Sequence, residues 1–251
     1  MTDTANGYFE AFVNSRASTP TAADRKTMAD ATAACRELLP GSQIRWAGSQ
    51  FKSTAIAGSD LDWCMETQSP VTESQRRDLR AHLERTLGRV VRVQSHVLRL
   101  PAAGVSPKID IAFANAAFGS RPLPDAGAFG AKPARQLAAR ALKVWLRAGG
   151  MPRVPGWVLE ALVVHLDAGV SAATGLQLFQ RTTDWLELKA TPSVLEGVLR
   201  PAAFPKWNPQ WSANLPGGLS ALQNAVRAQK RRRPRPEEWR SPADVEPWLV
   251  G

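Results

Sequence analysis

The chain has 251 residues and a formal net charge of +10, with 32 lysines and arginines against 22 aspartates and glutamates. Its length allows one large domain or two small ones with a buried core, and no apolar run approaches a membrane span. Two cysteines are too few for a disulfide framework or a zinc site, and the polar N-terminus lacks a signal-peptide pattern. We therefore expect an intracellular protein, cytoplasmic or, in a eukaryote, nuclear or organellar, whose basic surface attracts polyanions.

Two helices are expected before the first strand. They cover residues 6–14 and 22–38, and Thr19-Pro20-Thr21 supplies a start signal for the second. Cys35, in the second helix, and Cys64, in a later strand, are expected to be small buried side chains.

A pair of aspartates opens the second predicted strand. Residues 44–46 form the first strand and lead into Gly48-Ser49 and a short helix, and Asp60-Leu61-Asp62 follows Ser59. Because side chains alternate along a strand, Asp60 and Asp62 point to the same side, about 7 Å apart. Two such carboxylates are typical ligands for Mg²⁺, and a pair of metal ions can act on both oxygens of a phosphoryl displacement.

The Gly48-Ser49 turn complements these carboxylates. Glycine lets the backbone approach a phosphate closely, and the following helix start offers free N–H groups. The alternative is that these are ordinary turn residues and that the two aspartates cap a helix.

A third carboxylate lies downstream. Residues 72–87 predict a helix, residues 90–93 and 97–100 a strand or hairpin, and residues 108–113 an apolar strand with Asp110 in its middle. A carboxylate flanked by isoleucines is costly to bury unless it is paired or binds a metal. The alternative is an outward-facing residue on a half-exposed strand.

The second half of the chain is predominantly helical. Residues 122–127 are rich in turn formers and predict a crossing between two domains. Lys143 and Arg147 are four residues apart and fall on one helix face. Both, and Trp157, also have an ordinary interpretation as solvated charges and a core aromatic, and Trp145 is expected in the core. The predicted helices lie at residues 135–148, 157–168, 172–188, 191–199 and 219–230.

Between these last two helices, Trp207 and Trp211 lie four apart among prolines. The pattern favours core side chains, with a stacking platform for single-stranded bases as the alternative.

The densest positive charge lies near the C-terminus, and its basic residues are Lys230, Arg231, Arg232, Arg233 and Arg235. Such a run predicts contact with a nucleic-acid backbone, or a nuclear address. The alternative is a solvated helix end, since cations favour that end of the helix dipole. Trp239 and Trp248 indicate that the segment then returns to the body.

Several motifs resemble a known superfamily. Gly48-Ser49 and Asp60-Leu61-Asp62 have the spacing of the signature of DNA polymerase β-like nucleotidyltransferases. Lys52-Ser53-Thr54 resembles the Arg/Lys-Gly-Thr stretch of archaeal CCA-adding enzymes, oligoadenylate synthetases and bacterial cyclic-oligonucleotide synthases, with Ser53 replacing the usual glycine. Residues 142–147 and 156–160 resemble the Lys-x-Trp and Ser-Tyr-x-Leu-Glu elements of the poly(A) polymerase and oligoadenylate synthetase branch. The resemblance covers roughly residues 38–166.

The resemblance implies an α+β fold with two lobes. A mixed β-sheet nucleotidyltransferase core with helices would be joined to a mainly helical domain, with the active site in the cleft between them. Residues 1–40 would be helices packing on both lobes, 41–121 the catalytic domain, 125–229 the helical nucleotide- and substrate-binding domain, and 230–251 a basic tail.

The resemblance also implies the site residues. Asp60, Asp62 and Asp110 would be catalytic and would hold two Mg²⁺ or Mn²⁺ ions. Lys143 and Arg147 would hold the triphosphate of the NTP, and Trp157 takes the place of a tyrosine that stacks on the base. Gly156 stands where a serine usually contacts the triphosphate. The full set of implied nucleotide-binding residues is Gly48, Ser49, Lys52, Thr54, Ser59, Lys143, Arg147 and Trp157.

The expected activity is template-independent transfer of nucleoside monophosphates from NTPs to the 3′-hydroxyl of an RNA. The net charge and the basic run favour an RNA acceptor. The Lys-Ser-Thr element favours an alternative, an oligonucleotide second-messenger synthase of the cyclic-oligonucleotide or oligoadenylate kind. A third alternative is an inactive RNA-binding homologue, which the intact carboxylate set disfavours.

Overall fold

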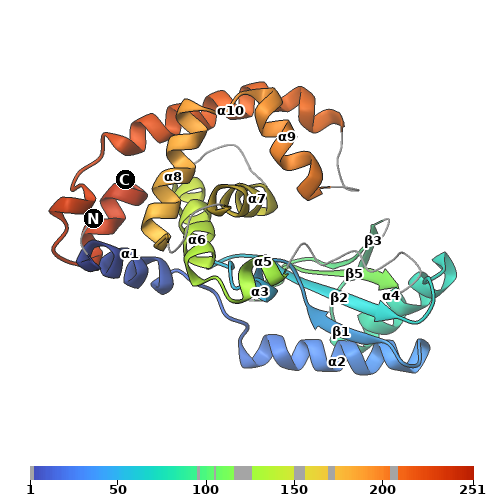
Figure 1. The fold of residues 1–251 in the computed structure, drawn as a ribbon. Coiled ribbons are helices and arrows are strands. Elements are labelled where there is room, and N and C mark those ends of the chain that lie inside the picture. The colour runs from blue at the N-terminus through green and yellow to red at the C-terminus, as the bar shows by residue number, and fades with distance from the viewer. Residues whose placement is uncertain are drawn as a thin grey trace. The chain divides into compact units, whose positions relative to one another are not determined.

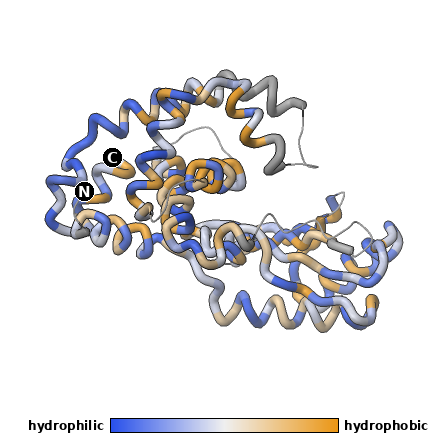
Figure 2. The backbone as a smooth tube through the Cα atoms, in the orientation of Figure 1, coloured by the Kyte–Doolittle hydropathy of each residue, from blue (hydrophilic) through white to orange (hydrophobic). Residues whose placement is uncertain are grey.

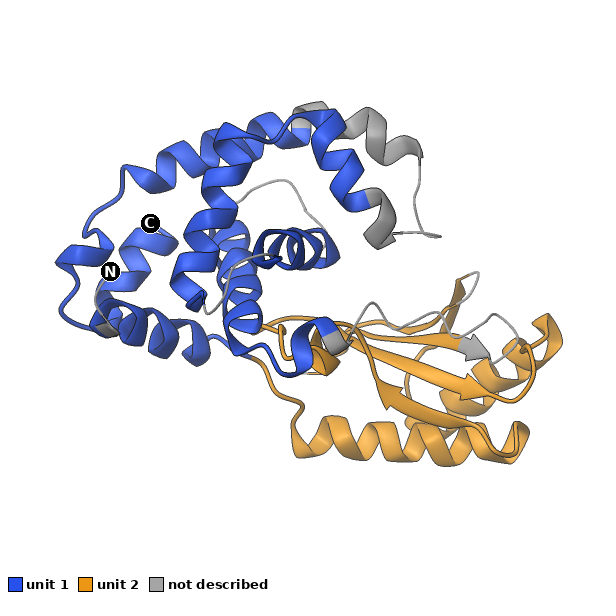
Figure 3. Ribbon diagram, in the orientation of Figure 1, with its two compact units in different colours: residues 1–17, 127–251 blue, residues 18–126 orange. Residues whose placement is uncertain are grey.

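A computed structural model describes residues 3–94, 97–104, 106–115, 126–149, 156–168, 173–203 and 209–251. The chain divides into two compact units (Figure 3). Unit 1 comprises residues 1–17 and 127–251, and unit 2 comprises residues 18–126. The chain therefore starts in unit 1, builds all of unit 2 and then completes unit 1.

Unit 2 is built around a five-stranded mixed sheet (Figure 1). β2 and β5 pair in parallel, and the other neighbouring strands are antiparallel. The strand predicted at residues 90–93 lies slightly later in the chain, and the others lie where they were predicted. In spatial order the strands are β1 (Gln43–Trp46), β2 (Leu61–Thr67), β5 (Ile109–Asn115), β4 (Val97–Leu100) and β3 (Arg92–Gln94).

The helices of unit 2 are α2 (Ala22–Leu38), α3 (Gly48–Phe51) and α4 (Glu73–Leu87). α2 begins where predicted because Thr21 and Asp24 form a reciprocal capping box, in which Asp24 N donates to Thr21 Oγ1 at 3.1 Å. Thr72 and Gln75 cap α4 in the same way. Gly88 ends α4 in the left-handed conformation, with φ of +60°. The predictions for α2 and α4 are confirmed.

The two faces of the sheet differ in character. One face packs against α2 and α4, and this apolar layer includes Trp63, Ile109 and Ile111. Because strand side chains alternate, the polar residues of the same strands lie on the other face. Cys35 and Cys64 are both buried, as predicted, and burial raises the pKa of the Cys35 thiol to about 12.

Unit 1 is helical. α1 packs on α6 and α8, and α7, which is apolar along most of its length (Figure 2), contacts α6, α8 and α9. The α-helices are α1 (Asp3–Ser15), α5 (Ala126–Gly130), α6 (Pro133–Ala148), α7 (Gly156–Asp167), α8 (Gly175–Leu188), α9 (Pro192–Ala203), α10 (Pro209–Lys230) and α11 (Val245–Leu249). Two short 3₁₀ helices, η2 (Pro236–Glu238) and η3 (Pro242–Asp244), precede α11. In the part of the chain that the structure describes, no helix combines the length and the apolarity needed to cross a bilayer.

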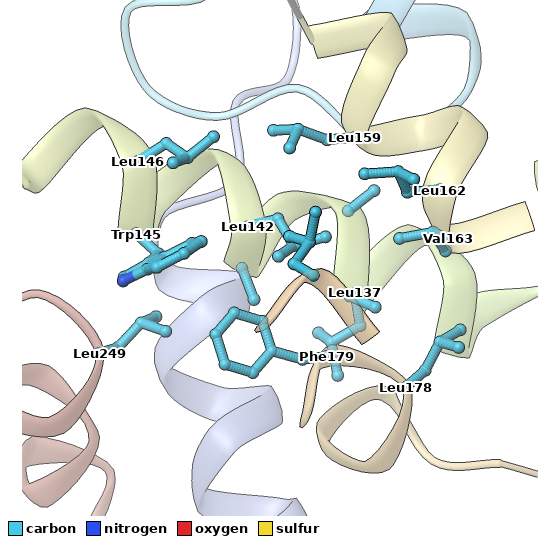
Figure 4. Close-up of a cluster of buried hydrophobic side chains, with 14 of the residues drawn as sticks. Leu137, Leu142, Trp145, Leu146, Leu159, Leu162, Val163, Leu178, Phe179 and Leu249 are labelled. Carbon is cyan, nitrogen blue, oxygen red and sulfur yellow. The ribbon is translucent and has the colours of Figure 1, made fainter. Parts of the chain in front are cut away.

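The core of unit 1 is one continuous apolar cluster. Trp145 is 1% exposed and lies edge-on to Phe179, with ring centroids 6.3 Å apart. Its predicted place in the core is therefore confirmed. Figure 4 shows both rings among leucines from α6, α7 and α8, with Leu249 of α11 reaching the same cluster. The last helix of the chain thus contributes to this core.

The C-terminal segment is folded onto unit 1. Trp239 and Trp248 are buried, and their rings meet edge-on with centroids 5.2 Å apart. Trp239 Nε1 donates to the carbonyl of Pro234 at 3.0 Å, so this buried indole keeps a hydrogen-bond partner. The prediction that the segment returns to the body is confirmed.

α10 begins ten residues before the helix predicted at residues 219–230. Pro209 stands at its first position, where a proline costs no hydrogen bond. Pro216, Gly217 and Gly218 lie inside this helix, although proline and glycine disfavour a helix interior. Trp211 falls within α10, and Trp207 lies outside the described residues.

The fold class predicted from the sequence is confirmed: a mixed sheet with helices in one unit and a mainly helical second unit. The location of a site between the two units stays a prediction, as does the functional division of the chain at residues 40, 121 and 229.

Candidate active site

The three predicted aspartates lie in one neighbourhood of unit 2. Asp62 on β2 and Asp110 on β5 occupy directly paired positions of the parallel strands. Asp60 immediately precedes β2. Lys108 Nζ lies 2.5 Å from Asp60 Oδ2 and 3.5 Å from Asp110 Oδ2, so one ammonium group contacts two of the three carboxylates. The topology thus brings together acids that are 50 residues apart in the sequence.

The cluster is electrostatically crowded. Burial raises the pKa of Asp62 above its ordinary value, and the negative charges of Asp110 and Asp60 raise it further. The nearby Lys108 and Lys52 oppose this effect without cancelling it. A buried carboxylate beside two others is stabilised by any cation that approaches it. The cluster therefore favours the binding of a cation.

Arg99 on β4 also contacts the cluster, which the sequence did not predict. Its Nε donates to Asp110 Oδ1 at 2.7 Å and its Nη2 to Asp110 Oδ2 at 2.9 Å. The hydrogen bonds to Asp110 raise the pKa of the Arg99 guanidinium. Arg99 and Asp110 are register partners on antiparallel strands, which places their side chains on the same face. The contact could not be predicted without the strand pairing, because only the pairing shows that Arg99 and Asp110 lie opposite each other.

Gly48 is fixed by its closeness to Asp62. Its φ is +55°, and a methyl group at its Cα would overlap the Asp62 carboxylate. The neighbouring Ala47 N donates to the Asp62 carbonyl at 2.8 Å. Any larger residue at position 48 would therefore both strain the backbone and displace Asp62. The glycine of the predicted phosphate turn is required first to make room for a carboxylate.

The segment after Gly48 is a tight local turn. α3 is a single helical turn, and the Ser49 carbonyl accepts a hydrogen bond from Thr54 N at 2.9 Å. Thr54 and Lys52 are both buried. Ser59 Oγ accepts from Ile56 N at 3.1 Å and thus shapes the loop that delivers Asp60. Five nucleotide contacts were predicted in this stretch. Each of them either shapes the local backbone or lies close to an aspartate, and they are Gly48, Ser49, Lys52, Thr54 and Ser59.

Ser53 occupies a conformation that favours glycine. Its φ is +56°, the one positive value at a non-glycine residue in the described chain. The left-handed region strains side chains with a Cβ atom. A glycine at position 53 would adopt this conformation without that strain.

The donor set suits a hard divalent cation, although the carboxylates face basic side chains as they stand. Three aspartates are typical oxygen ligands for Mg²⁺ or Mn²⁺. In the described ranges, no three acidic, histidine or cysteine side chains converge into a ready metal cluster. Arg99 and Lys108 supply positive charge beside the carboxylates where a metal would supply it. The residues present fit the ion by their chemistry.

The nucleotide-contact residues predicted in the second half lie in unit 1. Lys143 on α6 donates to Glu160 Oε1 on α7 at 2.8 Å, and these side chains are only 11% and 6% exposed. A Cβ atom at Gly156 would come within 3.0 Å of Lys143 Cε, so the glycine leaves room for the lysine. Trp157 is partly buried against the core of unit 1, and Arg147 is exposed. The structure thus gathers Lys143, Gly156 and Glu160, and the sequence did not predict the ion pair.

The basic run at residues 230–235 is partly neutralised. Lys230 Nζ lies 2.6 Å from carboxylates of both Asp184 and Glu187. Arg232 donates to the carbonyl of Leu249 at 2.9 Å, and Arg233 pairs with Glu238. Arg231 and Arg235 are exposed at the surface of unit 1. These two arginines are the members of the run best placed for an outside anion.

Comparisons with known proteins return similarity at the level of structure. No protein-family profile and no curated protein matches the sequence. A mutant of the Cid1 poly(U) polymerase bound to MgATP aligns with a TM-score of 0.72 at 11% identity over 98% of both chains. The GLD-2–GLD-3 poly(A) polymerase complex aligns with a TM-score of 0.66 at 13% identity, over 91% of this chain and 93% of the other. A cytoplasmic RNA terminal U-transferase aligns at 0.60 and 10% identity, over 76% and 74%.

At these identities the comparison shows a shared fold. It covers both units of the chain, well beyond the stretch on which the sequence resemblance rests. The resemblance inferred from the sequence is confirmed at the level of the fold, which the chain shares with structures of a terminal U-transferase, a poly(U) polymerase and a poly(A) polymerase.

Proposed function

We propose that this protein transfers nucleoside monophosphates from NTPs to the 3′-hydroxyl of an RNA without a template. The observation that carries the proposal is the pairing of Asp62 with Asp110 on adjacent parallel strands, with Asp60 joined to Asp110 through Lys108. Burial and the negative charges of Asp110 and Asp60 raise the pKa of Asp62, so the charged form of this carboxylate is disfavoured in the fold. Such a cost is typical of a functional site.

The aspartates would serve as ligands of divalent cations. Bound there, Mg²⁺ or Mn²⁺ would stabilise the charge that develops on the transferred phosphoryl group. Asp60, Asp62 and Asp110 supply the oxygen ligands. Gly48 keeps the backbone clear of Asp62, and the buried Lys52 adds positive charge that partly offsets the three carboxylates. The fold similarity to structures described with bound MgATP supports this assignment.

The helical unit would bind the incoming nucleotide. Lys143 donates to Glu160 at 2.8 Å, and this contact would hold its ammonium group in place beside a phosphate of the nucleotide. Arg147 lies one turn further along α6 and adds charge on the same face. Trp157 presents part of an indole that would stack on the base. In unit 2, the further proposed nucleotide contacts are Ser49, Thr54 and Ser59.

An RNA acceptor is favoured by charge. The chain carries a net charge of +10, and exposed arginines at 231 and 235 extend the basic surface of unit 1. Each phosphate neutralised by such a side chain releases counterions, which drives binding at low salt.

The experiment that tests this function incubates the protein with each α-labelled NTP in Mg²⁺ or Mn²⁺, with and without a short RNA. We expect the RNA to lengthen with at least one NTP. Small labelled products that resist phosphatase, formed without RNA, would instead identify a second-messenger synthase. If no label is transferred under any condition while RNA still binds, the protein is an inactive RNA-binding homologue.

A further inference from the structure

Arg99 contacts Asp110, the same carboxylate that the proposed metal would bind. Its guanidinium reaches both oxygens of Asp110, at 2.7 and 2.9 Å, and the Asp110 side chain is 17% exposed. Lys108, by contrast, touches one oxygen each of Asp60 and Asp110. A bidentate contact occupies one lone-pair site on each oxygen of the carboxylate. A metal that approached Asp110 from this side would therefore compete with Arg99 for the same oxygens.

In the sheet, Arg99 lies between one negatively charged and one positively charged residue on the neighbouring strands. On one side its cross-strand partner is Asp110, and on the other, across the β3–β4 pair, it is Arg92. Like charges directly opposite each other on antiparallel strands repel. The exposed Arg92 on edge strand β3 thus favours the orientation of Arg99 toward the carboxylates. The row Arg92, Arg99, Asp110, Asp62 runs across four neighbouring strands on one face.

We propose that Arg99 is a resident counter-cation that competes with the divalent metal for Asp110. Without metal, Arg99 neutralises Asp110 and stabilises unit 2. Metal binding displaces the guanidinium from at least one carboxylate oxygen, so part of the binding free energy is used to break this contact. Arg99 thereby lowers metal affinity and sets the concentration at which the site fills. The inference rests on the proposed function, because it takes the aspartates as metal ligands.

The test is a Mn²⁺ titration of the full-length protein without nucleotide, followed by the electron paramagnetic resonance signal of free Mn²⁺. Arg99→Gln keeps a polar side chain and removes the charge. We expect it to bind Mn²⁺ at least about tenfold more tightly than the wild type, since a charge-assisted bidentate contact no longer competes. Arg99→Lys, which keeps the charge and loses the fork, should lie between the two.

Arg45→Gln is the matched control. Arg45 lies on the same sheet face and pairs with Glu66 at 3.2 Å, so its loss removes the same charge from the same surface without touching Asp110. We expect its Mn²⁺ affinity to stay close to that of the wild type. An equal gain in Arg45→Gln and Arg99→Gln would reduce the effect to net charge and overturn the competition.

Thermal unfolding supplies a second readout. Arg99→Gln should unfold at a lower temperature than the wild type without metal, because Asp110 loses its counter-ion, and the gap should close in saturating Mn²⁺. A purely structural arginine would leave the same gap with and without metal, and that result would overturn the proposal.

The failures of the two proposals differ. If Mn²⁺ binds the wild type, is lost in Asp62→Asn, and binds Arg99→Gln no more tightly, only the competition is wrong. If neither the wild type nor Arg99→Gln binds Mn²⁺, or Asp62→Asn binds it unchanged, the aspartates are not the metal site, and both proposals fail.

Discussion

The aspartate cluster of unit 2 and the Lys143–Glu160 pair of unit 1 show two ways of handling buried charge. In the pair, one ammonium meets one carboxylate at 2.8 Å, and both side chains are nearly buried. In the cluster, three carboxylates lie near one another and the pKa of Asp62 is raised by burial and by its acidic neighbours. The pair balances its charge within the fold. The three members of the cluster are all negatively charged, so the positive charge that offsets them comes from Arg99 and Lys108.

The two arrangements should respond differently to substitution. A matched buried pair stabilises only while both partners are present, because removing one leaves an uncompensated charge. A crowded set of like charges destabilises the fold and is relieved by neutralising a member. Neutralising Asp62 should therefore lower activity and raise stability, whereas a substitution at the pair should lower stability.

The largest effect is expected at the cluster. Asp60→Ala, Asp62→Ala and Asp110→Ala should each lower turnover by about three orders of magnitude, because each removes electrostatic stabilisation of the transition state. Nucleotide transfer to RNA under saturating NTP measures this. Near-normal turnover in Asp110→Ala would remove β5 from the site.

At the pair, Lys143→Ala should lower the free energy of unfolding by about 3 kcal/mol, because the buried Glu160 loses the positive charge of its partner. Denaturant unfolding measures this. Lys26→Ala is the control, since Lys26 forms an exposed pair with Asp30 and its loss should cost under about 1 kcal/mol. If Lys143→Ala is as stable as Lys26→Ala, the buried pair does not form.

Trp157 distinguishes core from nucleotide contact. Trp157→Ala should raise KM for NTP about tenfold to a hundredfold with a smaller change in kcat, because a stacked base gains about 1–3 kcal/mol in ground and transition state alike. Trp157→Phe should restore most of the loss, since a smaller ring still stacks. An unchanged KM together with a lower unfolding temperature would assign Trp157 to the core alone.

A smaller gain in stability is expected at Ser53. Ser53→Gly should stabilise unit 2 by up to about 1 kcal/mol, because glycine adopts a φ of +56° without strain. The reverse change, Gly88→Ser, is matched: its φ is +60° and no atom lies within 4 Å of the added Cβ, so it should lose about as much. Equal stability of Ser53→Gly and the wild type would show that the strain is absorbed elsewhere.

The pH dependence should differ in sign between two aspartates. The pKa of Asp62 is raised above 3.8, so the folded state binds its proton more tightly, and stability falls as pH rises from 3.8 through the raised pKa. Asp62→Asn should therefore be more stable than the wild type at pH 7, by a margin that shrinks toward pH 4.

Asp244 supplies the opposite case. Hydrogen bonds from the backbone of Arg240 and Ser241 lower its pKa below 3.8, so its stabilisation is present above that value and fades as pH falls through the lowered pKa. Asp244→Asn should be less stable than the wild type at pH 7. Unfolding temperatures between pH 3 and 8 measure both, and parallel curves for the two variants would contradict the raised pKa of Asp62.

The sequence predicted the features that depend on residues close together in the chain. The start of α2 follows from the Thr21–Asp24 capping box, and the strand carrying Asp110 follows from its apolar neighbours. The nearness of Asp62 and Asp110 followed from a resemblance that supplied the strand order. Periodicity alone does not show that the two strands carrying these aspartates are neighbours in the sheet.

The contacts that the sequence did not predict depend on tertiary structure. Arg99 reaches Asp110 through a strand register that no local pattern encodes. Lys143 meets Glu160 across two helices, 17 residues apart. α10 continues through Pro216-Gly217-Gly218, where local helix propensity is poor, so tertiary context outweighs propensity there.

The most direct measurement is the transfer of labelled nucleotide to RNA by Asp62→Asn beside the wild type, in Mg²⁺ at pH 7. The change keeps the shape of the side chain and removes only its charge. We predict that turnover falls about a thousandfold while the unfolding temperature stays at or above that of the wild type. Transfer at the wild-type rate by Asp62→Asn, or no transfer by the wild type with any NTP, would contradict a nucleotidyltransferase site at these aspartates.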